Sequence, residues 1–80
     1  MKAIVTVGLR PGVLDTQGKA VASALRGLGF SAVESARVGK VIELDIPGLD
    51  PQTAEAEVRD MCEKLLANTV IESYRIDIAR

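Results

Sequence analysis

The chain has 80 residues, of which 10 are lysine or arginine and 11 are aspartate or glutamate, so its net charge is −1. A chain of this length is expected to form one domain, residues 1–80, with one small core. Phosphate-driven nucleic-acid binding normally requires a basic surface, and base stacking would have only Phe30 and Tyr74. We therefore expect no nucleic-acid partner.

Two residue types narrow the possible chemistry. Histidine is absent, which excludes Ser-His-Asp and Cys-His catalytic arrangements on this chain and ordinary histidine-containing zinc sites. Cys62 is the one cysteine, so no internal disulfide forms, as is usual in a reducing compartment. No apolar run approaches the length of a membrane span, and the N-terminus resembles a strand rather than a signal peptide. We expect a cytoplasmic protein with no membrane partner.

The first half of the chain predicts a strand, a helix and a hairpin. Residues 4–9 read as a central strand that ends at the Pro11-Gly12 turn. Asp15 suits a helix N-cap, and Gly29 suits the left-handed position after the helix. The predicted buried stripe of this helix is Val21, Ala24, Leu25 and Leu28, and Gly18 and Gly27 are candidates for close backbone approach. Residues 33–38 and 41–46 then read as strands joined by a type II′ turn at Gly39-Lys40.

The second half predicts a helix and a final strand. Asp50-Pro51 is a strong helix start, and the predicted buried stripe is Val58, Met61, Cys62 and Leu65, with Leu66 beside it. Asn68 suits a left-handed C-cap, and residues 70–78 read as a strand. The order β-α-β-β-α-β predicts an α+β two-layer sandwich of the ferredoxin-like type, a four-stranded antiparallel sheet with both helices on one face. The other face, or a strand edge, would remain available to a partner.

The residues alone do not predict an active site. Cys62 lies on the predicted buried stripe, the acidic residues of the second helix alternate with Arg59 and Lys64, and no glycine-rich phosphate loop is present. Arg37 and Lys40 flank the predicted hairpin tip, where they would meet solvent, an anion or an acidic partner. On composition and periodicity, the chain is a small interaction module.

Three segments, taken together, resemble a known family. They are GVLDTQGKA at 12–20, VGKVIEL at 38–44, and MCEKLLAN at 61–68 followed by VIE at 70–72. They are similar to the PurS family, the small subunits of bacterial and archaeal phosphoribosylformylglycinamidine (FGAM) synthase, and the resemblance spans essentially the whole chain. The family usually has proline where Thr16 and Thr69 stand here.

The resemblance implies a non-catalytic subunit of an ATP-dependent amidoligase in purine biosynthesis. Such a subunit would assemble a glutaminase subunit with a large synthetase subunit and support ammonia transfer from glutamine to formylglycinamide ribonucleotide. ATP and Mg²⁺ would bind the large subunit, with no cofactor or metal on this chain. We also expect a homo-oligomer, dimer or tetramer, formed through strand edges or sheet faces. The candidate subunit-interface residues are Asp15, Gln17, Lys19, Arg37, Gly39 and Lys40.

Two other interpretations remain open from the sequence. The turn at 9–14, with its Pro11-Gly12, also resembles the ligand loop of ACT regulatory domains, which share this element order and bind amino acids at dimer interfaces. The third possibility is a structural oligomer without enzyme partners. Amino-acid binding by the isolated chain would favour an ACT-like domain, and failure to co-purify with either enzyme subunit would favour the structural oligomer.

Overall fold

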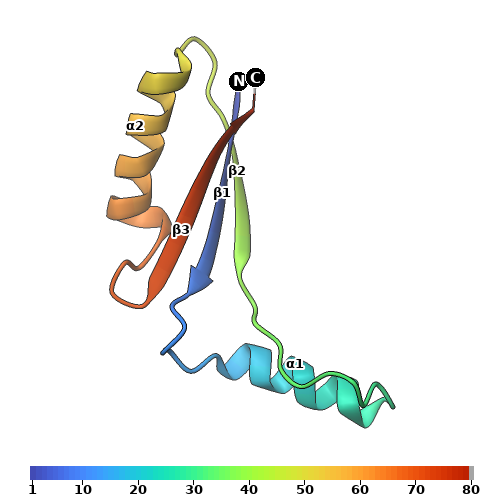
Figure 1. Ribbon diagram of the computed structural model, residues 1–80. Coiled ribbons are helices and arrows are strands. Elements are labelled where there is room, and N and C mark those ends of the chain that lie inside the picture. The colour runs from blue at the N-terminus through green and yellow to red at the C-terminus, as the bar shows by residue number, and fades with distance from the viewer. Residues whose placement is uncertain (80) are drawn as a thin grey trace.

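A computed structural model describes residues 1–79 and shows three strands, two α-helices and one π-helical turn (Figure 1). The strands are β1 (Lys2–Leu9), β2 (Lys40–Asp45) and β3 (Glu72–Ala79), in the sheet order β2-β1-β3. The helices are α1 (Thr16–Gly27) and α2 (Pro51–Met61), and α2 continues into the π-helical turn η1 (Cys62–Leu66).

β1 is the central strand, as its apolar sequence predicts. It pairs antiparallel with β2, from Lys2 opposite Asp45 to Val7 opposite Lys40. It also pairs antiparallel with β3, from Lys2 opposite Ala79 to Leu9 opposite Glu72. Because the central strand is paired on both sides, the free edges of the sheet are the outer sides of β2 and β3.

The core lies on one face of the sheet, beneath α2. Ala3, Val5 and Val7 point from β1 toward Val58 and Cys62 and are fully buried or nearly so. Half-buried side chains from β2 and β3 surround them, namely Ile42, Leu44, Tyr74, Ile76 and Ile78. On the opposite face Glu43 and Asp45 are exposed, as the alternation of the sequence predicts.

The predicted four-stranded sheet with two helices on one face is wrong, because the sheet has three strands. Residues 33–39 form no ladder and run as a stretch that leads from α1 into β2 (Figure 1). A type II′ turn requires positive φ at its first central residue. Among residues 1–79 only Gly29 and Gly48 have positive φ, so Gly39 does not turn the chain back.

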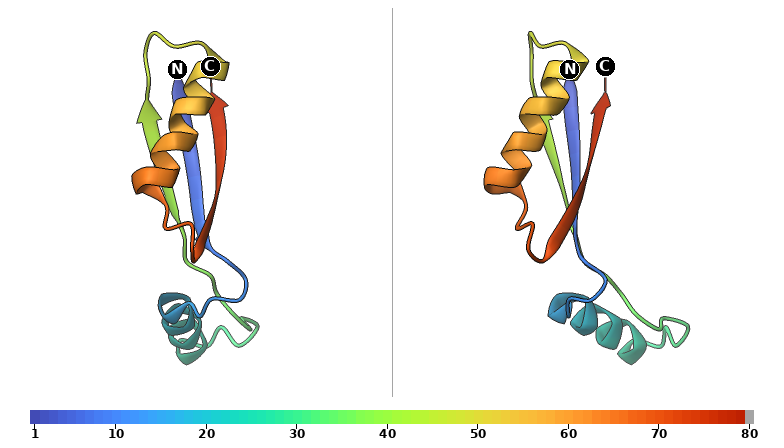
Figure 2. Two further views of the ribbon diagram at one scale, coloured as in Figure 1. Left: turned by 90° about the vertical axis from the view of Figure 1, so that its left-hand side faces the viewer. Right: turned by 60° about the vertical axis from the view of Figure 1, so that its left-hand side comes forward.

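α1 lies beyond the end of the sheet rather than on its face (Figure 2). Of the two α-helices, α2 packs on β1 and β3, whereas α1 makes no extensive contact with any described strand. We call residues 12–39, comprising α1 and the stretch that returns to β2, the arm. The predicted buried stripe of α1 is therefore wrong in large part. Gly18 and Ala22 are its buried residues, and Val21 and Leu28 are exposed.

The end of α2 also differs from the prediction. Val58 and Cys62 are buried, but Met61 and Leu65 are exposed. In η1 the amide of Ala67 donates to the carbonyl of Cys62 at 3.1 Å, and this wider turn changes which side chains face the sheet. Asn68 is not left-handed, since no described residue other than glycine has positive φ. Its side chain instead accepts a hydrogen bond from the amide of Val70 at 3.2 Å.

Candidate functional site

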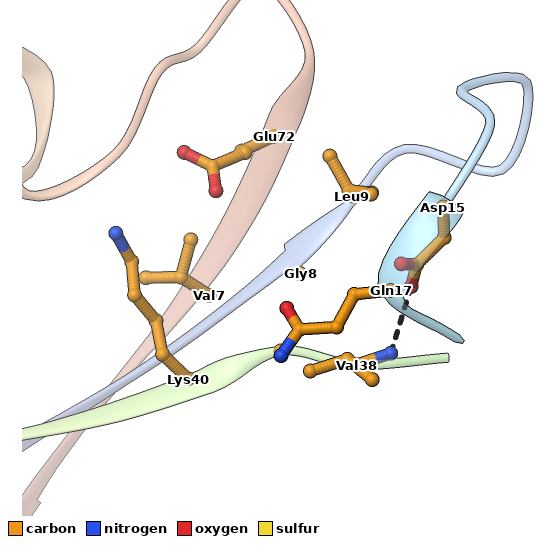
Figure 3. A pocket seen from close by; sticks show the side chains of 9 residues that line it. Val7, Gly8, Leu9, Asp15, Gln17, Val38, Lys40 and Glu72 are labelled. Carbon is orange, nitrogen blue, oxygen red and sulfur yellow. Dashed lines mark hydrogen bonds between the residues drawn. The ribbon is translucent and has the colours of Figure 1, made fainter. Parts of the chain in front are cut away.

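A pocket of about 230 Å³ lies where the arm joins the sheet (Figure 3). Its walls come from the end of β1, the start of α1, the start of β2 and the start of β3. The lining residues are Val7, Gly8, Leu9, Asp15, Gln17, Val38, Gly39, Lys40 and Glu72. Four of the six predicted interface residues are among them, so the structure brings together positions that lie more than 20 residues apart in sequence.

Asp15 holds the two sides of the arm together. One carboxylate oxygen caps α1 by accepting from the amide of Gly18 at 2.7 Å. The other accepts from the amide of Val38 at 2.8 Å, across the arm. Asp15 is only 7% exposed, and these two backbone hydrogen bonds, that from Val38 foremost, hold the pKa of its carboxyl below its usual range. The structure therefore gives Asp15 an internal role.

Arg37 fixes the loop between β1 and α1. Its guanidinium donates to the carbonyls of Leu9, Arg10 and Val13, at 3.1, 3.1 and 3.2 Å. These carbonyls belong to the turn that also suggested an ACT-like ligand loop. Because the guanidinium donors are directed at this backbone, Arg37 supports the junction from within the chain.

Arg10 ties the same loop to the start of β3. Its guanidinium donates to the carbonyl of Thr69 at 2.9 and 3.3 Å, and its own amide donates to the carbonyl of Ile71 at 2.8 Å. Together with Asp15 and Arg37, it sets the position of the arm relative to the sheet. This position depends on polar contacts to backbone rather than on a shared apolar core.

Gly39 is needed for close packing at the junction. A Cβ atom at this position would lie 2.5 Å from the carbonyl oxygen of Val7, closer than non-bonded atoms approach. The glycine therefore lets the return stretch pass directly against β1. In a role as interface residue, Gly39 would act through its backbone.

Of the predicted interface residues, Arg37 is exposed but donates to backbone within the chain, and Gln17, Lys19 and Lys40 also have exposed side chains. Gln17 and Lys40 line the pocket from α1 and β2, while Lys19 lies outside it on α1. Figure 3 shows the Gln17 amide, the Lys40 ammonium and the Glu72 carboxylate around the same space. No finding tests the contacts of these residues with other subunits, so that role remains a prediction.

Glu72 lines the junction but is not one of the candidate residues predicted from the sequence. Glu72 opens β3 opposite Leu9, and its carboxylate accepts from the amide of Asn68 at 2.6 Å. The antiparallel pairing of the first and last strands places the start of β3 beside the end of β1. Antiparallel pairing of these two strands could therefore have pointed to Glu72 from the sequence, because it places a charged residue at the start of the last strand beside the junction.

The described residues contain no cluster of three or more histidine, cysteine, aspartate or glutamate side chains suited to a metal ion. Nor is any described helix long and apolar enough to cross a membrane.

Comparison with known proteins decides the family. The model of the family PurS, Phosphoribosylformylglycinamidine (FGAM) synthase, matches residues 2–80. The chain belongs to the PurS family. A PurS subunit of FGAM synthase from Synechocystis is 50% identical over 72 residues, which cover 90% of this chain and 72% of that protein. The predicted family is therefore confirmed, and with it the role of a PurS-family chain as a subunit of FGAM synthase.

Two solved PurS structures match the fold. The chain is 37% identical to Methanocaldococcus jannaschii PurS, with a TM-score of 0.90 and coverage of 99% of this chain and 95% of that one. That protein is one of the subunits of formylglycinamide ribonucleotide amidotransferase in the purine biosynthetic pathway. A chain in the structure of PurLQS from Thermotoga maritima is 32% identical, with a TM-score of 0.85 and coverage of 95% and 93%. The extended arm thus occurs in a fold that PurS structures share over nearly their whole length.

Proposed function

We propose that this chain is the small assembly subunit of FGAM synthase, which joins the glutaminase subunit to the ATP-dependent synthetase subunit in the cytoplasm. The observation that carries the proposal is its similarity, over 95% of its length, to a chain in the PurLQS structure of Thermotoga maritima. ATP and Mg²⁺ would bind the synthetase subunit. This chain would supply no reacting group.

The shape of the molecule supports a bridging role. Its extents are 49 × 26 × 14 Å, and the arm projects beyond one end of the sheet (Figure 2). A flat sheet with one uncovered face and a projecting arm presents separate surfaces to two larger subunits. The hydrogen bonds of Asp15, Arg37 and Arg10 hold these surfaces in a fixed relation.

The benefit of a bridge follows from the chemistry of ammonia. At neutral pH free ammonia is mostly protonated, and ammonium is not a nucleophile. Two active sites held in register turn a diffusional encounter into a local delivery, which raises the effective concentration of the nucleophile. An assembly subunit of this kind would accelerate the glutamine-dependent reaction without changing the chemistry at either site.

The experiment is to titrate this chain into the synthetase and glutaminase subunits and to measure FGAM formation with glutamine or with ammonium salt. We expect glutamine-dependent turnover to rise with the chain and to saturate, while the ammonium-dependent rate changes little. Equal stimulation of both reactions, or of neither, would contradict the proposal. Amino-acid binding by the chain alone would then be tested next.

A charge reversal tests the predicted contact surface. Lys40→Glu changes the exposed ammonium at the junction and should raise the concentration of chain needed for half-maximal turnover. Lys2→Glu, at the opposite end of the sheet, is the matched control and should behave like the parent. If the two variants behave alike, the junction is not the surface that contacts the enzyme subunits.

A further inference from the structure

The junction pocket carries charges of both signs that the chain leaves unpaired. Lys40 on β2 lies opposite Val7 of the central strand. Glu72 on β3 lies opposite Leu9 of the same strand. Residues directly opposite one another project from the same face of a sheet, so the two charged side chains flank β1 on one face. Within residues 1–79 neither of them forms an ion pair.

The pocket offers further polar groups and an apolar floor. One carboxylate oxygen of Glu72 accepts from the amide of Asn68, which leaves the second oxygen available to a ligand. The exposed carboxamide of Gln17 faces the same space from α1, and it can both donate and accept (Figure 3). Val7 and Leu9 supply the apolar floor. With a volume of about 230 Å³, the pocket is smaller than the pockets of about 300–1,000 Å³ that hold drug-sized ligands, so its size suits a small metabolite.

The arrangement of charges selects the class of ligand. The carboxylate of Asp15 also lines the pocket, but its two oxygens already accept from backbone amides. A simple anion would be attracted to Lys40 and repelled by both carboxylates, whereas a simple cation would be attracted to Glu72 and repelled by Lys40. A zwitterion satisfies both unpaired charges at once, through charge-assisted hydrogen bonds that are stronger than neutral ones.

We propose that the junction pocket binds a small zwitterion of the α-amino acid class, with the carboxylate of the ligand at Lys40 and its ammonium group at Glu72. A ligand whose side chain ends in a carboxamide also matches the amide of Gln17. This inference concerns the chain alone and does not depend on the proposed function.

The site is distinct from the ligand loop that the turn at 9–14 resembles. The carbonyls of Leu9, Arg10 and Val13 in that turn accept from the guanidinium of Arg37 and are therefore already engaged. The proposed ligand lies on the sheet side of the junction, and one chain supplies all of its contacts.

The pocket spans the two parts of the molecule, so its occupant would tie them together. Gln17 and Val38 belong to the arm, whereas Lys40 and Glu72 belong to the sheet. Since α1 makes no extensive contact with any described strand, a ligand held from both sides would stabilise the arm in the position seen here. The amide of Val38, which donates to Asp15 across the arm, should then exchange its hydrogen at least threefold more slowly when the ligand is bound.

The test is a titration of the ¹⁵N-labelled full chain with L-glutamine, followed by the NMR signals of its glycine amides. We expect the amides of Gly8 and Gly39, which line the pocket, to shift with half-saturation below about 5 mM. The amides of Gly27 and Gly48 lie outside the pocket and should not move. No shift up to about 10 mM, or shifts confined to Gly12 in the turn at 9–14, would overturn the proposal.

Two analogues of glutamine separate the roles of the two charges. Glutaramate lacks the ammonium group, and 4-aminobutanamide lacks the carboxylate. Each should bind at least about fivefold more weakly than L-glutamine, because each leaves one charged side chain of the pocket without its partner. If either analogue binds as tightly as L-glutamine, the pocket does not recognise a zwitterion.

Two variants test the residues themselves. Lys40→Met keeps most of the side-chain length, and Glu72→Gln keeps an oxygen that can accept from the amide of Asn68. Each should weaken binding of L-glutamine at least about fivefold. The matched controls are Lys2→Met, at the opposite end of the sheet, and Glu57→Gln, at an exposed position of α2, and both should bind like the parent.

Pocket variants that bind L-glutamine as tightly as the parent would overturn the proposal, provided that their spectra show the native fold. Loss of glutamine-dependent turnover with unchanged binding by the chain alone would instead concern the proposed function.

Discussion

Gly18→Ala is the substitution for which the structure gives the sharpest expectation. A Cβ at this position would lie 2.2 Å from the carbonyl oxygen of Ala36 in the return stretch, and 2.8 Å from a carboxylate oxygen of Asp15. Ordinary contact begins near 3.4 Å, so either the return stretch or α1 must move by about 1 Å. The hydrogen bond between Asp15 and the amide of Val38 lies in the same place and would be weakened.

The magnitude combines two opposing effects. Alanine is favoured over glycine within a helix by about 1 kcal/mol, whereas forcing an extra methyl into a packed site costs about 1–3 kcal/mol. Since the obstacle is backbone, the cost lies in the upper part of that range, about 2–3 kcal/mol, and the expected net loss is about 1–2 kcal/mol. That corresponds to a melting temperature lower by about 5–15 °C for a chain of this size.

Gly27→Ala is the matched control, because a Cβ there meets nothing within 4 Å. It should raise the melting temperature by about 2–8 °C through helix propensity alone. Both variants are compared with the parent by thermal denaturation at one protein concentration, since self-association would otherwise shift the transition. If Gly18→Ala melts at or above the parent, the arm does not pack as described.

Three further predictions concern the core and the junction. Val58→Ala, in the fully buried core, should lower the free energy of unfolding by about 2–3 kcal/mol in urea titrations, while the exposed Val70→Ala should change it by less than about 0.5 kcal/mol. Burial raises the pKa of the Cys62 thiol, so iodoacetamide at pH 8 should alkylate it slowly in the native chain and rapidly in urea; rapid native labelling would contradict its buried position. Because the pKa of Asp15 is lower in the folded chain, its ionised carboxylate stabilises the fold at pH values above the unfolded pKa of about 3.9. This stabilisation is lost as the pH falls through the lower pKa of the folded state. The melting-temperature difference between parent and Asp15→Asn should therefore be constant near neutral pH and shrink below about pH 4, with the exposed Asp45→Asn as control.

The elements that the sequence predicted correctly are those governed by local signals. Asp50 caps α2 by accepting from the amide of Thr53 at 2.8 Å, with Pro51 as the first helical residue. Gly29 adopts a φ of 102° after α1, as a left-handed C-terminal glycine does. The β-branched run of β1 placed it at the centre of the sheet. Each of these signals acts within a few residues, so one sequence is enough to interpret it.

The arm could not be predicted in the same way. The buried stripe of α1 was predicted on the assumption that its apolar side chains face the sheet of their own chain. Leu28 is exposed, however, and α1 lies beyond the end of the sheet (Figure 2). Likewise, four of the six candidate interface residues line one pocket, but the roles of Asp15 and Arg37 depend on carbonyls and amides more than 20 residues away. The resemblance to the family identified these positions without indicating which of them act inside the chain.

The difference between the predicted hairpin and the observed arm shows which interactions determine the path of the chain here. A turn at Gly39-Lys40 would depend only on the backbone conformation of these two residues, which glycine at the first position favours, and it would close a β-hairpin. Instead, Asp15 binds the amide of Val38, and Arg37 binds the carbonyls of Leu9 and Arg10, so the residues just before Gly39 are held against the start of α1 and the end of β1. A closed hairpin would require these hydrogen bonds to break and would separate the buried Asp15 carboxylate from the amide of Val38. The same polar contacts that abolish the hairpin leave residues 33–38 without a strand partner in their own chain.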